Sequence, residues 1–174
     1  MFLGGLKAKS VLRKIKQIAG NRAYKGSKKP IEHVAIIQSV NCAMQEHEIA
    51  SLAQSLEIPR DKITVLTYVK KVAKEDKDNE QVFGEAQIGW NGSPKNQVLK
   101  SFTQTPFDIL ISSYGDEDIV AYALTAQSNA RFKVGVSNAI EGINDLVIYK
   151  KDDQAFQIFI AELIKYLHIL KIAS

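Results

Sequence analysis

Short apolar runs rich in β-branched residues alternate with stretches whose apolar residues recur every three or four positions, through most of the chain. The runs predict buried strands, because a strand covered on both faces lacks polar alternation. The intervening stretches predict helices with one apolar face. Strands that alternate with helices are typical of a mainly parallel sheet with right-handed crossovers. The sequence therefore predicts an α/β fold, a single Rossmann-like or flavodoxin-like domain of three layers.

The elements can be placed by their periodicity and their turn residues. The predicted strands are 34–39, 62–69, 107–114, 133–137 and 145–149. The predicted helices are 8–22, 45–56, 94–102, 116–129 and 153–171. Ser93 and Pro94 suit the N-cap and the first residue of the third helix. The segment 70–85 is highly charged and weakly patterned, which predicts an exposed loop or a ragged helix.

Charge is distributed very unevenly along the chain. The first thirty residues carry nine Lys or Arg and no Asp or Glu, whereas the rest carries 14 basic and 19 acidic side chains. We therefore divide the chain into a basic amphipathic helix with its linker, residues 1–30, and an α/β domain, residues 31–174. Such asymmetry points to an anionic partner. The candidate residues are Lys7, Lys9, Arg13, Lys14, Lys16, Arg22, Lys25, Lys28 and Lys29.

The identity of that partner stays open between two classes. RNA or a ribonucleoprotein is the first choice and an anionic membrane surface is the second, because both present phosphate groups to cations. The alternatives without a partner are a solvated lysine face and an apolar stripe that docks on the domain. An organelle transit peptide has a similar composition. The leading hypothesis is a non-enzymatic interaction protein of the cytoplasm, or one peripheral to the inner membrane face.

Polar residues follow several predicted strands, where ligands of open parallel sheets bind. This rule gives a second hypothesis, a small-molecule-binding or transferase-like domain. Trp90 and Asn91 lie in a glycine-flanked turn that forms either a recognition surface or a plug at the edge of the core. The other interpretation of all these residues is that they are ordinary loop and cap residues. The candidate ligand-binding residues are Trp90, Asn91, Ser112, Ser113, Tyr114, Asp116 and Asn138.

The composition gives no reason to expect a cofactor, a metal or a membrane span. No glycine-rich phosphate loop occurs, and Lys or Arg interrupts every apolar stretch before the roughly eighteen residues of a spanning helix. The single Cys42 cannot form an internal disulfide, which favours a reducing compartment. It precedes a predicted helix, so it is either an activated thiol or an inert, partly buried one. The broad apolar circumference of helix 153–171 leaves a homodimer open.

Five strings resemble a bacterial family catalogued only as a domain of unknown function. They are the basic N-terminal helix, 88–92 (Ile-Gly-Trp-Asn-Gly), 107–112 (Phe-Asp-Ile-Leu-Ile-Ser), 132–135 (Phe-Lys-Val-Gly) and 144–148 (Asn-Asp-Leu-Val-Ile). The resemblance covers nearly the whole chain and implies a bacterial, cytoplasmic protein. It implies no activity and no catalytic residues. Residues 107–135 are also similar, at the level of fold, to the N-terminal half of heptosyltransferase-type glycosyltransferases.

Overall fold

The computed structural model describes residues 4–24, 29–151 and 155–172, which contain one six-stranded sheet. Its strand order is β3-β2-β1-β4-β5-β6, and every neighbouring pair is parallel. The predicted Rossmann-like or flavodoxin-like architecture is confirmed. The strands are β1 (Val34–Ser39), β2 (Ile63–Tyr68), β3 (Val82–Phe83), β4 (Ile109–Ser113), β5 (Phe132–Gly135) and β6 (Leu146–Val147).

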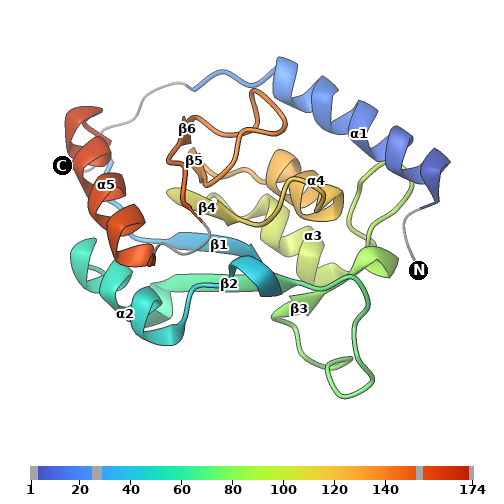
Figure 1. Cartoon of the computed structure of the whole chain (residues 1–174), viewed down its shortest axis with the longest axis horizontal. Helices are drawn as coiled ribbons and strands as arrows, with labels where there is room; N and C mark the ends of the chain where they lie inside the picture. Colours follow the sequence, from blue (N-terminus) through green and yellow to red (C-terminus); the bar gives the residue numbers. More distant parts are fainter. Residues whose placement is uncertain (1–3, 25–28, 152–154, 173–174) are drawn as a thin grey trace.

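Helices cover both faces of this sheet (Figure 1). In the described part of the chain, three helices lie on one face and two on the opposite face. These helices are α1 (Gly5–Gly20), α2 (Glu46–Ser55), α3 (Gln97–Gln104), α4 (Ile119–Gln127) and α5 (Phe156–Ile169). The first group is α1, α3 and α4, and the second is α2 and α5.

The core is divided by the sheet into two apolar clusters. Side chains of β1 alternate between them, with Ala35 and Ile37 facing α3 and α4, and Val34 and Ile36 facing α2 and α5. Every residue of β1 and β4 is buried. Burial on both faces is the physical reason that these strands begin with continuous apolar runs in the sequence.

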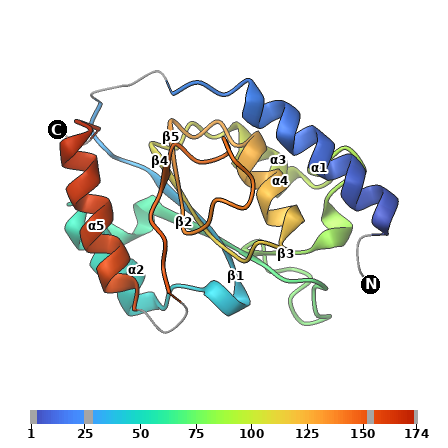
Figure 2. The same cartoon turned by 45° about the horizontal axis from the view of Figure 1, so that its top comes forward.

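Helix α1 packs along α4 rather than projecting from the domain (Figure 2). Its apolar stripe, formed by Val11, Ile15 and Ala19, is buried in the same cluster as α3 and α4. Docking of the apolar stripe on the domain, which was one of the alternatives for this helix, is therefore what the structure shows. Because the stripe is fixed, the direction in which the basic residues of α1 point is fixed as well.

One local prediction was wrong in part and another was wrong. Residues 70–81 form a loop, as predicted, but the predicted loop also contains β3, which pairs with β2 through two residues only, too few to give a periodic signal. Helix α3 begins at Gln97, because Asn96 rather than Ser93 is its N-cap and accepts a hydrogen bond from the Leu99 amide at 2.9 Å. Pro94 instead forms an antiparallel bridge with Ile88.

Lys133 on β5 is a cation inside the core. It is 1% exposed, and its Nζ donates to the carbonyls of Thr125 at 2.6 Å and Ala126 at 3.2 Å, near the C-terminal end of α4. Burial, together with the nearby Arg22 guanidinium, lowers the pKa of the lysine amine to about 7 despite the attraction of Asp145. Lys133 therefore caps α4 at an electrostatic cost that depends on pH.

The substitution Lys133→Met tests whether burial of the lysine amine makes the free energy of unfolding depend on pH. A lysine in an unfolded chain has a pKa of about 10.4. From pH 7 upward the unfolded chain therefore binds more protons than the native state, so the free energy of unfolding rises with pH. Urea denaturation between about pH 7 and pH 9 should show this rise in the native sequence and a flatter profile in Lys133→Met.

Buried tyrosines set the upper limit of the pH range over which the free energy of unfolding rises. Burial raises the pKa of Tyr68 and of Tyr114, so above about pH 10 their ionisation in the unfolded chain lowers stability again. Equal slopes for the two proteins between pH 7 and pH 9 would contradict the assignment of a depressed pKa to Lys133.

Candidate functional site

The outer face of α1 is a surface of exposed cations. With the apolar stripe against α4, four basic side chains point to solvent: Lys9, Arg13, Lys14 and Lys16. Helix α1 contains no acidic residue, and within 4–24, 29–151 and 155–172 none of the four forms an ion pair. Lys14 Nζ donates to Gln17 Oε1, at 3.4 Å. These four residues, the basic surface of α1, carry uncompensated charge on a helix that the core holds in place.

The other candidate cations of residues 1–30 are placed differently. Lys7 is half-buried, and its Nζ donates to the Glu85 carbonyl at 3.3 Å. Its burial and the neighbouring Lys95 lower the pKa of Lys7. Lys29 is exposed. Lys25 and Lys28 lie outside the described residues.

Arg22 is engaged inside the protein rather than presented to solvent. Its Nε donates to Asp145 Oδ1 at 3.1 Å, and its terminal nitrogen lies 2.5 Å from Oδ2. The two side chains are 19% and 8% exposed. Asp145 Oδ2 also accepts from the Lys133 amide at 2.8 Å, so the ion pair ties the end of α1 to β5. Sequence reasoning missed Asp145, because 123 positions separate it from Arg22.

Trp90 projects from a turn that lies against α1. A β-carbon at Gly92 would stand 3.5 Å from Val11 Cγ1, and Gln127 donates to the Gly92 carbonyl. Asn91 Oδ1 accepts from the Ser93 amide at 3.1 Å, which stabilises the turn. Trp90 itself is 62% exposed, whereas Ile88 is buried. The interpretation of Trp90 as a plug of the core was therefore wrong, and its ring is available to a partner.

Three of the strand-end candidates are buried and bonded to the protein itself. Tyr114 Oη donates to Thr125 Oγ1 at 2.7 Å, and Ser112 Oγ lies 3.3 Å from the same hydroxyl. Ser113 Oγ donates to the Cys42 carbonyl at 2.6 Å, which joins the end of β4 to the chain after β1. The structure thus brings these side chains onto internal partners rather than into an open polar site.

The remaining strand-end residues form a separate group. Asp116 is exposed and accepts a hydrogen bond from Ser137, whose hydroxyl in turn accepts from Tyr122 at 3.3 Å. Asn138 is exposed and next to this group in sequence.

Asp118, which sequence reasoning missed, is buried and accepts from the Gly115 amide at 2.9 Å. Its burial raises the pKa of the Asp118 carboxyl, which the Gly115 and Ser39 hydrogen bonds oppose.

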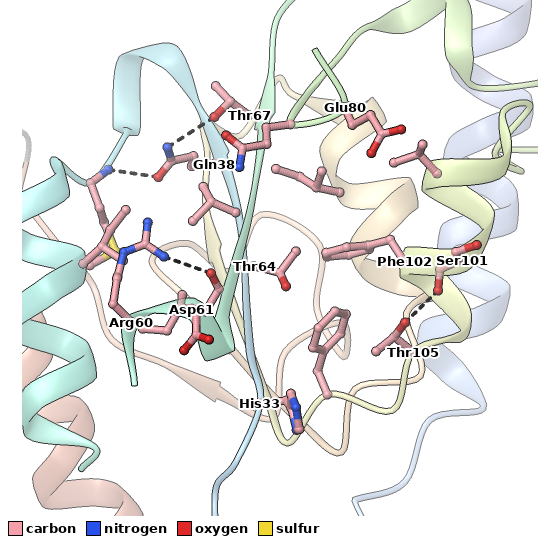
Figure 3. A pocket seen from close by; sticks show the side chains of 18 of the residues that line it. His33, Gln38, Arg60, Asp61, Thr64, Thr67, Glu80, Ser101, Phe102 and Thr105 are labelled. Carbon is pink, nitrogen blue, oxygen red and sulfur yellow. Dashed lines mark hydrogen bonds between the residues drawn. The ribbon is translucent and has the colours of Figure 1, made fainter. Parts of the chain in front are cut away.

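A cavity of about 790 Å³ lies elsewhere, along the edge of β2 between α2 and α3 (Figure 3). Its polar lining includes Gln38, Thr64 and Thr67. None of the candidate residues from the sequence lines it. No sequence signal marked this region, because an open strand edge is defined by the absence of a neighbouring strand rather than by a residue pattern.

The comparisons place the chain among proteins without a known activity. Residues 7–170 match the model of the family of unknown function DUF6913. The chain belongs to this family. The match begins within α1, so most of that helix is part of the region that defines the DUF6913 family. No curated protein and no solved structure matched the chain.

Two further findings concern the described part of the chain alone. It contains no group of three or more His, Cys, Asp or Glu side chains arranged to hold a metal ion. It also contains no helix with the length and apolar character needed to cross a membrane.

Single substitutions should separate structural cations from free ones. We expect Arg22→Ala to lower the free energy of unfolding by about 2–4 kcal/mol, because it leaves the nearly buried Asp145 carboxylate without its ion-pair partner. Lys9→Ala is the matched control and should change stability by less than about 0.5 kcal/mol. Urea denaturation of both variants measures the difference. Equal losses would contradict the division of these basic residues into two classes.

Proposed function

We propose that this protein is a non-enzymatic binding domain that docks on RNA or a ribonucleoprotein through the basic surface of α1. The observation that supports the proposal is the set of four exposed cations, Lys9, Arg13, Lys14 and Lys16, on a helix without acids. Phosphate groups of a nucleic acid neutralise such cations and release condensed counterions. A helix fixed on the core brings them to the partner without a cost for ordering the backbone.

The packing of α1 favours RNA over a membrane as the partner. A helix that binds in the plane of a bilayer buries its apolar face among the lipids. In α1 that face, with Val11, Ile15 and Ala19, is already buried against α4. The charges remain available, and a phosphate backbone requires little more than charge. The exposed ring of Trp90, in the turn beside α1, adds one surface on which a base can stack.

The alternative of a small-molecule-binding or transferase-like domain receives less support. It relied on hydroxyl groups meeting at the carboxyl ends of the strands. Ser112, Ser113 and Tyr114 are buried there and have partners within the protein. Asp116 and Asn138 are exposed, but the observations at these positions indicate no particular ligand.

Charge reversal of the whole surface tests the proposal. The variant Lys9→Glu/Arg13→Glu/Lys14→Glu/Lys16→Glu should lose most of its affinity for single-stranded RNA in fluorescence anisotropy. The slope of log K against log salt should fall by about 0.7 for each lost phosphate contact. An unchanged salt slope would contradict the proposal.

A second reversal on another surface controls for total charge. Lys71, Lys74, Lys77 and Lys100 are also exposed, and reversing them changes the net charge by the same amount. We expect this variant to keep most of its RNA affinity. Binding to vesicles of phosphatidylserine and phosphatidylcholine is measured in parallel. Stronger binding to these vesicles than to RNA would contradict the choice of RNA and identify an anionic lipid surface as the partner.

A further inference from the structure

Among the residues that the structure describes, no strand lies beside the first half of β2 on its outer side. Strand β3 pairs with Thr67 and Tyr68 alone, so the pairing covers only the end of β2. On the inner side, β1 pairs with β2 over its full length, from Ile63 to Tyr68. The sheet therefore ends in a short open edge between Ile63 and Thr67.

The backbone groups of Val65 point out of this edge. The amides of Thr67 and Val69 donate toward the β3 side, to Gln81 at 2.7 Å and Phe83 at 2.9 Å. Residues two apart in a strand direct their N–H and C=O groups to the same side, so those of Val65 also face outward. Among the residues with described structure, neither group of Val65 has a hydrogen-bond partner across this edge.

The neighbouring groups explain why the open edge is confined to Val65. At one end, the Arg60 guanidinium donates to the Ile63 carbonyl at 3.0 Å. At the other end, the Gln81 amide, which would continue the ladder to Val65, donates to Asn79 Oδ1 at 3.0 Å instead. The chain before β3 therefore turns away from β2 and leaves one donor and one acceptor unpaired.

This edge runs along the floor of the 790 Å³ cavity (Figure 3). One wall is formed by Met44 and by Ile49 of α2. The opposite wall is formed by Phe102 of α3 and by Phe107. These four side chains are only 3–5% exposed, so much of the lining that a ligand meets beside the free backbone is polar, as at Thr64, Thr67 and Ser101.

We propose that this groove binds an extended peptide segment of a partner protein, which adds to the sheet as a strand beside β2. Alternate side chains of a strand point to opposite faces, so those of the peptide would lie toward α2 and toward α3 in turn. Its backbone would pair with the N–H and C=O of Val65. A second copy of this chain fits poorly, because its own β2 edge is recessed between the same two helices.

The charge of the groove favours a basic peptide. Arg60 is neutralised by Glu46, whose carboxylate it contacts at 2.6 Å. Asp61 and Glu80, which also line the cavity, form no ion pair with any residue that the structure describes. Two uncompensated carboxylates at the cavity wall would stabilise Lys or Arg in the bound segment.

The test uses a defined probe, the acetylated and amidated peptide Lys-Val-Thr-Val-Thr-Val-Lys, and the full chain labelled with ¹⁵N. We expect a saturable shift of the Val65 amide resonance and slower hydrogen exchange at that amide. The matched control peptide has the same side chains with N-methyl groups on alternate residues, which removes the backbone donors along one edge. It should bind at least about tenfold more weakly.

Variants of the protein test the same contacts. Val65→Pro removes the outward N–H while the ladder to β1 uses the alternate residues, and it should weaken binding at least about tenfold. If that variant fails to fold, Ser101→Trp, at an exposed position of the α3 wall, blocks the groove instead.

Asp61→Lys/Glu80→Lys should weaken binding of the basic peptide. Lys9→Glu should leave it unchanged, which keeps this test independent of the proposed RNA surface.

Two results would overturn the proposal. One is the absence of any change at Val65 up to about 1 mM peptide, beyond which binding would be too weak for a specific site. The other is equal affinity for the N-methylated peptide, which would show that the backbone of the edge takes no part in binding.

Discussion

The contact between α1 and α4 determines how the rest of this molecule is arranged. Burying Val11, Ile15 and Ala19 turns the basic face of α1 outward, since the apolar and charged residues lie on opposite sides of the helix. Two glycines accommodate α1, one near its middle and one near its C-terminal end. Gly92, with φ +78°, lies against Val11, and Gly142, with φ +81°, lies against Ala19. A glycine at these two left-handed positions lets the backbone turn and approach the helix closely.

The contact between α1 and α4 also explains why polar residues at the strand ends bond to the protein itself. Helix α4 lies between the sheet and α1, so its residues from Val120 to Ala126 are all buried. A buried hydroxyl such as that of Thr125 needs partners, and Tyr114 and Ser112 supply them. Lys133 satisfies the carbonyls near the C-terminal end of the helix. These side chains could bind a ligand if they lay in an open crevice. In this protein they instead form hydrogen bonds with buried polar groups of α4.

Much of the fold could be predicted from the sequence because burial on both faces leaves a direct trace. Strands β1 and β4 begin with apolar runs, 34–37 and 109–111, and the stripe of α1 recurs at helical spacing. Strand β3 left no such trace, since its pairing depends on a neighbour rather than on its own two residues. Asn96 and Ser93 are both suitable N-caps, and tertiary contacts at Pro94 decide between them.

The candidate site was less predictable, because exposure and pairing are properties of the folded chain. Composition alone gave Arg22 and Lys9 the same role, yet one is bound to Asp145 and the other faces solvent. The exposure of the Trp90 ring was equally unpredictable from the sequence, since a lone tryptophan between glycines suits either a core or a surface. Periodicity reports which residues prefer burial, and it does not report which polar groups meet across distant segments.

The two proposed surfaces differ in charge and in the elements that support them. The basic surface of α1 depends on α4, whereas the groove depends on β2, which β1 holds over its whole length. Their candidate residues share no partner within the described chain, so substitutions in one should act independently of the other. The net charge of +4 thus combines a basic helix with a groove that retains two unpaired carboxylates. Under the two proposals, a polyanion and a basic peptide bind different parts of the same domain rather than competing for one site.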